Sequence, residues 1–207
     1  MTVATDTWSA LAAERRRFAD SLASLPSDAW EKPSLCAGWT VRDVVAHIVA
    51  GAKNTPGGFI VGLVSSGFNF DKFIAKGLAK EKGQTPAQLI AALKGLVDAK
   101  TKPGSAMLGE IIVHGEDVRR AVGFTTGTPD PANVRVVAEA YKKAGPPLRV
   151  KKRIAGLTLK ATDADWSTGT GPEVSGPLLD LVLAMAGRTA GHGALSGPGL
   201  ATLKSRS

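Results

Sequence analysis

Hydrophobic residues recur at helical spacing through the first two thirds of the chain. Leu11, Phe18 and Leu22 lie on one face of a segment that ends before Pro26, which is the period of an amphipathic helix. Helix-start signals follow downstream, with a capping-box variant at Thr40 and Asp43 and a proline placed for the first turn after Thr85. The pattern predicts helices over residues 6–24, 40–53, 85–100, 106–122 and 130–144.

Segment 59–82 is apolar at first and then patterned, but glycines at three positions weaken its helical signal. The hydrophobic period changes after residue 145. Segments 148–154 and 157–161 alternate apolar with charged positions around Ala155-Gly156, which is typical of a β-hairpin. A short strand near residues 173–174, an apolar helix over 178–186 and a small closing element over 195–203 complete the expectation.

The order of these elements predicts the fold class. Helices come first and strands with a helix come after them, which is typical of an α+β protein rather than of a parallel sheet. We therefore expect two domains, a helical bundle over residues 1–145 and a small α/β domain over residues 146–207.

The composition is that of an ordinary globular protein. The chain has 207 residues, of which 43% are hydrophobic, and Cys36 is its sole cysteine. One cysteine excludes an internal disulfide framework and suits a reducing compartment. The first residues carry three arginines where a signal peptide needs an apolar core, and the longest apolar runs are too short to span a bilayer. We expect a cytoplasmic protein with no membrane partner.

The positive charge is concentrated in the last third of the sequence. Of the formal net charge of +8, residues 1–130 contribute +2 and residues 131–207 contribute +6. Six cations lie close together, Lys142, Lys143, Arg149, Lys151, Lys152 and Arg153. Such a cluster can contact phosphates, but only Tyr141 interleaves with it and no nucleic-acid motif surrounds it. We expect a solvated surface that attracts anionic substrates, and no nucleic-acid partner.

Two of the three histidines lie in apolar helical runs. His47 lies in one of them, and His114 lies in another with Glu110 four residues earlier, on the same face of the helix. Because a carboxylate in an apolar stretch needs a compensating partner, a divalent cation held by His47, Glu110 and His114 from two facing helices is one interpretation. Two histidines and one carboxylate leave a coordination position open, as in catalytic metal sites.

Other interpretations of these residues stay open on spacing alone. Glu110 and His114 can form a helix-stabilising pair, and a histidine on an apolar face is commonly a core residue. His192, among small residues near a loop, is expected at the surface. Cys36, with no histidine near it in the sequence, is expected to be a packed residue rather than a nucleophile, and the pair of Asp163 and Asp165 is expected to belong to a turn.

The run from Leu35 to His47, LCAGWTVRDVVAH, resembles the signature of the mycothiol-dependent maleylpyruvate isomerase family, within the DinB-like metal-binding four-helix bundles. In that family a Gly-Trp-Thr-x-x-Asp-x-x-x-His segment brings the first metal ligand, here His47. A later helix brings a Glu-x-x-x-His pair, here Glu110 and His114. The C-terminal part, with ATDADW before residue 167 and AGR ending at Arg188, resembles the family's small domain, so the resemblance covers about residues 30–200.

The resemblance implies an enzyme that uses mycothiol as its thiol. It implies that zinc or another divalent metal binds the bundle and accepts the sulfur of mycothiol, whose thiolate attacks a small electrophilic substrate. Arg188 matches the family's C-terminal arginine, which implies a catalytic role toward a substrate carboxylate. Asp43 is expected to cap its helix.

Segment 59–82 departs from the characterised isomerase and is similar to an uncharacterised actinobacterial branch. It follows the first ligand helix and can line the pocket. The expected activity is therefore that of a mycothiol-dependent isomerase or S-transferase, with the electrophile undefined. The alternative is a non-catalytic metal or ligand sensor built on the same bundle. The sequence does not define the oligomeric state.

Overall fold

The protein is described by a computed structural model that covers residues 6–100 and 104–207. Its contacts divide the chain into two units, Met1–Pro129 and Asp130–Ser207. The boundary differs from the expected one at residue 145 because helix α7 (Pro131–Tyr141) packs against α9 (Leu178–Met185) in the second unit. A hydrogen bond of 2.9 Å from Trp166 Nε1 to Glu139 Oε1 ties α7 to that unit further.

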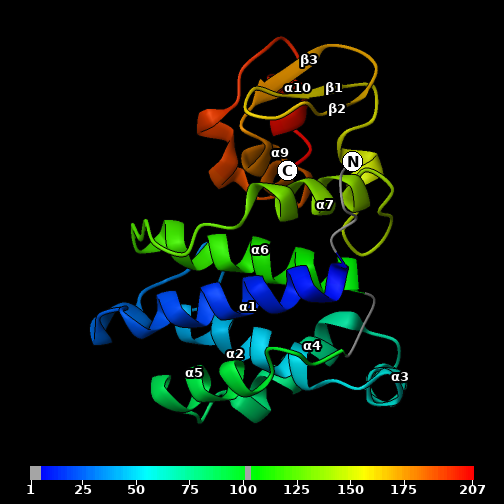
Figure 1. Cartoon of the computed structure of the whole chain (residues 1–207). Helices are drawn as coiled ribbons and strands as arrows, with labels where there is room; N and C mark the ends of the chain where they lie inside the picture. The colour runs from blue at the N-terminus through cyan, green and yellow to red at the C-terminus, as the bar shows by residue number, and fades with distance from the viewer. Residues whose placement is uncertain (1–5, 101–103) are drawn as a thin grey trace. The chain divides into compact units, whose positions relative to one another are not determined.

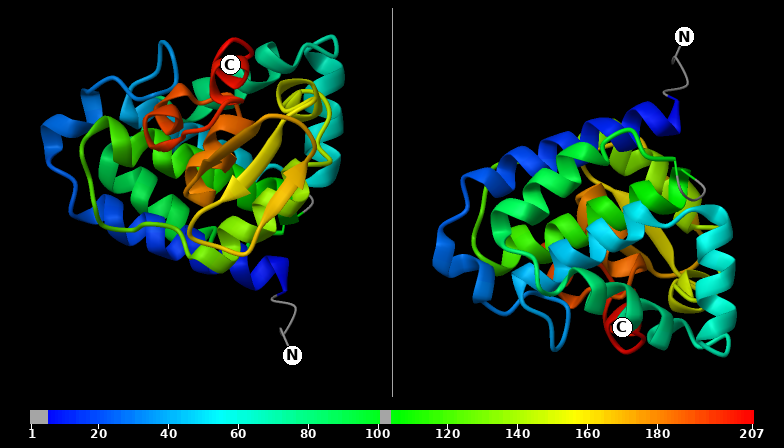
Figure 2. Two further views of the ribbon diagram at one scale, coloured as in Figure 1. Left: turned by 90° about the horizontal axis from the view of Figure 1, so that it is seen from above. Right: turned by 90° about the horizontal axis from the view of Figure 1, so that it is seen from below.

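Four helices of the first unit close into a ring, as the expected bundle requires. Helix α1 packs against α5 and α6, and α2 packs against the same two helices from the other side (Figure 1). The right view of Figure 2 looks onto these helices. The helices of this unit are α1 (Thr7–Ala23), the 3₁₀ turn η1 (Ser27–Glu31), α2 (Val41–Lys53), α3 (Pro56–Ser65), α4 (Phe70–Glu81), α5 (Pro86–Gly95) and α6 (Gly104–Ala121).

The helix-start signals of the sequence are present as hydrogen bonds. Thr40 and Asp43 form a capping box at α2, and Thr85 and Gln88 form another at α5. Helix α5 ends at Gly95, earlier than the expected residue 100. The carbonyls that follow it accept hydrogen bonds from Arg15 of α1, which meets the need of a helix end for donors.

Segment 59–82 forms parts of two helices. The main packing partner of helix α3 among the described elements is α4. Helix α4 in turn packs against α2. Phe68, at a φ of 58°, turns the chain between them. Gly62 permits their close approach, because a Cβ there would lie 2.6 Å from the Phe73 ring.

The second unit contains a three-stranded sheet covered by α9. The strands lie in the order β2-β1-β3, with β1 antiparallel to β2 and parallel to β3; the left view of Figure 2 shows them. The elements that follow α7 are α8 (Val150–Arg153), β1 (Thr158–Ala161), β2 (Ser167–Gly169), β3 (Glu173–Gly176), α9, the 3₁₀ turn η2 (Thr189–Ala194) and α10 (Leu200–Lys204). The α+β class is confirmed.

The expected hairpin of 148–154 with 157–161 is wrong. Residues Val150–Arg153 form one helical turn, in which Val150 is buried while Lys151 and Lys152 are exposed. The guanidinium of Arg153 donates to the carbonyls of Leu148 and Met185. One buried apolar residue satisfies a helical turn as well as a strand, so the alternation in this short run did not decide between them. Instead, β1 pairs with β2 and β3.

No helix in the described ranges is long and apolar enough to cross a membrane.

Candidate metal centre

The first part of the candidate site comes from α2. The capping box holds the start of the helix, with Asp43 Oδ2 accepting from Thr40 N at 3.0 Å, so the expected capping role of Asp43 is confirmed. His47 follows one turn later, beside the fully buried Val44 and Val45. The helix thus buries one face and places the His47 side chain, 14% exposed, at the edge of the core.

The second part comes from α6, which packs against α2. Glu110 and His114 lie one helical turn apart, and both reach toward His47. Nε2 of His47 lies 3.2 Å from Glu110 Oε2, and Nε2 of His114 lies 3.6 Å from the same oxygen. The two imidazole centroids are 4.9 Å apart. The structure therefore brings together all three residues that the sequence selected.

The spacing of the donor atoms fits one ion. One nitrogen or oxygen from each of His47, Glu110 and His114 lies within 4.8 Å of the others. Bonds of about 2.0–2.2 Å in a tetrahedral arrangement put neighbouring donors about 3.3–3.6 Å apart, close to the separations of 3.2 and 3.6 Å found here. Two imidazoles and a carboxylate suit zinc and several other divalent metals.

Burial of Glu110 differs from the expectation. The sequence places this carboxylate in an apolar run, but its side chain is 41% exposed. It therefore does not need a cation to offset burial, and the argument for an ion depends on donor geometry rather than on an unpaired buried charge.

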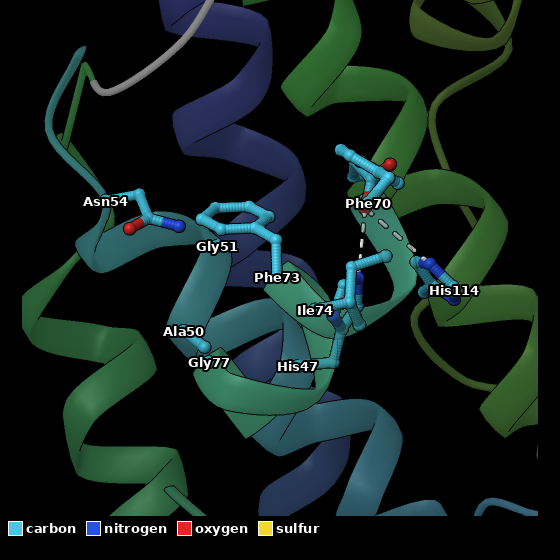
Figure 3. Close-up of a pocket in the computed structure, with 10 residues that line it drawn as sticks. His47, Ala50, Gly51, Asn54, Phe70, Phe73, Ile74, Gly77 and His114 are labelled. Carbon is cyan, nitrogen blue, oxygen red and sulfur yellow. Dashed lines mark hydrogen bonds and ion pairs between the residues drawn. The ribbon is translucent and has the colours of Figure 1, made fainter. Parts of the chain in front are cut away.

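A pocket of about 90 Å³ opens beside the three donors. Helix α4 supplies one wall of it, with Phe70, Phe73 and Ile74 (Figure 3). The α4 part of segment 59–82 thus lines the pocket. A mostly apolar wall with a few convergent polar groups is typical of small-molecule sites.

Sequence reasoning missed two residues behind His114. Nδ1 of that ring lies 3.0 Å from Oδ2 of Asp117, which is fully buried, and 3.6 Å from Sγ of Cys36. The thiol donates to the same Asp117 oxygen at 3.0 Å. Cys36 has no histidine near it in the sequence, but the fold brings His114 beside it. The i, i+3 spacing of His114 and Asp117 was a usable signal, whereas Cys36 lies near them only through the fold.

The remaining sequence candidates lie in the second unit. Arg188 follows α9, and its Nη1 donates to the carbonyl of Ala186 at 3.3 Å. Its charge also helps to lower the pKa of Arg153, after the larger effect of burial. Asp163 and Asp165 lie in the bend between β1 and β2, where a turn was expected, and Asp163 accepts from the backbone N–H of Leu178 at 2.8 Å. His192 is buried, so its expected surface position is wrong.

The fold and the donor set define a class: a four-helix bundle that gathers two histidines and a glutamate from two helices, followed by a small α+β unit. Residues 11–103 match the family model of the mycothiol maleylpyruvate isomerase N-terminal domain. The matched stretch includes His47 but ends before α6. The assignment of Glu110 and His114 to the site therefore depends on their distances from His47.

Two solved structures have the same fold. One is a histidine-to-alanine mutant of the mycothiol-dependent maleylpyruvate isomerase, with a TM-score of 0.63 and 14% sequence identity. The other is the crystal structure of the mycothiol-dependent maleylpyruvate isomerase, with a TM-score of 0.58 and 15% identity. Each comparison covers 93% of this chain and 91% of the other. No curated protein matches the sequence.

Proposed function

We propose that this chain is a cytoplasmic, metal-dependent enzyme that uses mycothiol in an isomerase or S-transferase reaction on a small electrophile. The observation that carries the proposal is the convergence of His47, Glu110 and His114 on one point beside a pocket. The family supports the choice of mycothiol as the thiol, and the donor set supports zinc or a similar divalent ion.

His47, Glu110 and His114 would hold the ion and leave a coordination position for a thiol. When bound, the metal would supply Lewis acidity, which lowers the pKa of a coordinated thiol and makes it nucleophilic near neutral pH. The chain's own residues set the place of that chemistry. Phe70, Phe73 and Ile74 exclude water from one side of the pocket, which strengthens electrostatic interactions inside it.

We assign Arg188 a role toward the carboxylate of an anionic substrate, because its family position matches and its planar fork suits a carboxylate. Replacing Arg188 with Gln should raise KM for an anionic electrophile more than for a neutral one. An equal effect on both substrates would contradict this role.

Metal content tests the proposal directly. We expect about one divalent ion per chain after reconstitution with zinc, and loss of that ion in Glu110→Ala. Glu31→Ala is the matched control, because Glu31 is an exposed carboxylate of the same unit that pairs with Arg42. Retention of the ion by a folded Glu110→Ala protein would reject the assigned ligands.

Thiol binding separates an enzyme of this kind from a metal sensor. Adding mycothiol to the cobalt-substituted protein should produce a sulfur-to-cobalt charge-transfer band, and the same addition to Glu110→Ala should not. A wild-type protein that holds the ion yet shows no thiol band and no turnover of activated double-bond substrates would favour the sensor.

A further inference from the structure

His114 makes polar contacts through both of its ring nitrogens. Nε2 faces Glu110 in the candidate metal centre, at 3.6 Å from Oε2, while Nδ1 faces Asp117 Oδ2 at 3.0 Å. A carboxylate in such a contact accepts, so the hydrogen bond requires a proton on Nδ1. A neutral ring with its proton on Nδ1 leaves the lone pair on Nε2 free for an ion.

Asp117 is held in place from a second side. Its side chain has no solvent exposure, and the Cys36 thiol donates to the same Oδ2 that faces His114. The loop that carries Cys36 is itself tied to α6, because Leu35 N donates to the Asp117 carbonyl at 3.2 Å. Ser34 Oγ also accepts from Cys36 N at 3.1 Å. These two bonds hold the backbone of Leu35 and Cys36 in place beside Asp117.

We propose that Asp117 and Cys36 are a positioning pair for the metal ligand His114. Asp117 selects the ring form with Nδ1–H and aims Nε2 at the centre, and Cys36 anchors the Asp117 carboxylate. This inference rests on the proposed function, because it assigns the pair to the same ion. Carboxylates behind ligating histidines raise ligand basicity and hold the ring in orientation.

The contacts favour a positioning pair over a second ion bound by Cys36, Asp117 and His114, although these three also lie within ligand distance of one another. The thiol and the imidazole approach one oxygen at 3.0 Å each, which is hydrogen-bond geometry. Neither Cys36 nor Asp117 lines the pocket onto which His47 and Glu110 open.

Zinc affinity, measured by competition with a chromophoric chelator, tests the pair. Asp117→Asn should weaken binding about 10- to 100-fold, as is usual for the carboxylate behind a ligating histidine. Cys36→Ala should cause a smaller loss, and Cys36→Ser should recover most of it because a hydroxyl also donates to a carboxylate. Asp43→Asn is the control, since the contacts of this carboxylate are those of a cap on the other ligand helix.

Two spectroscopic measurements go beyond affinity. In ¹⁵N spectra of the zinc protein, His114 should carry its proton on Nδ1, and Asp117→Asn should disturb this form. In the cobalt protein without added thiol, we expect no thiolate-to-cobalt band. Such a band, lost in Cys36→Ser, would make Cys36 a ligand and overturn the positioning role.

The outcomes separate this inference from the proposed function. Unchanged affinity in Asp117→Asn, with the ion lost in Glu110→Ala, would reject the positioning pair alone. A wild-type protein without bound ion would reject both. If Asp117→Asn does not fold, the Cys36→Ala and Cys36→Ser proteins still decide, because equal affinity in both and in the wild type contradicts the anchoring role.

Discussion

At the scale of single residues, Arg15 is a charged side chain in the interior of the first unit, with 1% of its surface exposed. Its Nη1 donates to the carbonyls of Leu96, Val97 and Ala99, at 2.7 to 3.2 Å. Burial lowers the pKa of Arg15 to about 10, and the charge of Asp98 opposes that shift. The guanidinium therefore stays charged at neutral pH and serves as a donor for the end of α5.

Replacing Arg15 with Met should lower the free energy of unfolding by at least about 2 kcal/mol, because carbonyls lose a charged donor. The neighbouring Arg16→Met should change it by less than about 0.5 kcal/mol. Arg16 is 59% exposed and lies 3.7 Å from an exposed Asp98, and such pairs contribute little. Chemical denaturation of both proteins makes the comparison. Equal losses would show that Arg15 has no special role at α5.

At the residue scale, three residues of the candidate site could be predicted from the sequence. The sequence predicted His47 because it ends a family motif. It predicted Glu110 and His114 because they share a helix face. Asp117 and Cys36 were missed, since hydrogen bonds across α6 and a loop depend on tertiary structure. The burial of His192 was missed for the same reason. No local pattern showed that η2 packs against α9.

At the scale of elements, the contact of α3 with α4 depends on Gly62. Its missing side chain leaves room for the ring of Phe73, which also lines the pocket of the candidate metal centre. Aromatic contact continues on both sides, because Phe73 meets Phe59 and Phe70 at centroid distances of 5.1 and 6.0 Å. A small residue in α3 thus determines where a pocket wall lies.

Gly62→Ala should displace the Phe73 ring and lower the free energy of unfolding by about 1–3 kcal/mol, as overpacking does. Gly57→Ala, in the same helix, should be neutral or stabilise by up to about 1 kcal/mol, because no atom of the described residues outside its own helical backbone and chain neighbours lies within 4 Å of the place that its Cβ would take. Denaturation midpoints for the two variants test the difference. A neutral Gly62→Ala would mean that the ring moves freely.

The accuracy of the helix predictions followed the strength of local signals. Helices α2 and α5 start where capping boxes stand, and α6 ends close to Gly123, whose φ of 67° suits a helix end. Strand β2 was not predicted because Ser167, Thr168 and Gly169 carry no apolar alternation. Its strand conformation comes from pairing with β1, which is a non-local effect.

At the scale of the whole molecule, two of the six cations in the basic stretch of the second unit are engaged in contacts within that unit. Lys142 pairs with Glu139 at 2.5 Å, and the guanidinium of Arg153 is directed to backbone carbonyls. The other four cations of the cluster, Lys143, Arg149, Lys151 and Lys152, are exposed. The basic stretch therefore contributes both to the internal contacts of the unit and to its surface charge.

The second unit should lose stability on mild acidification through His192. Burial, and to a lesser degree the charge of Lys204, lower the pKa of His192 from its ordinary value of 6.5. The unfolded chain therefore binds a proton at a higher pH than the folded one. The stability gained by the neutral ring is present above pH 6.5 and is lost as pH falls toward the lowered pKa.

Hydrogen exchange of peptides from residues 178–204, measured at neutral pH and at mildly acidic pH, tests this dependence. Protection should decrease on acidification in the wild type and decrease less in His192→Gln. The same pH dependence in both proteins would assign the effect to another group.

The backbone hydrogen bond from Leu35 to Asp117 has a consequence for engineering. Two short stretches, residues 34–47 and 110–117, contain the three proposed ligands and the proposed positioning pair, and this bond joins one stretch to the other. The proposed centre is therefore suited to transplantation as two short segments. A host bundle with two facing helices and a loop of the same length before one of them could receive it, provided that the loop-to-helix bond is transplanted with the side chains.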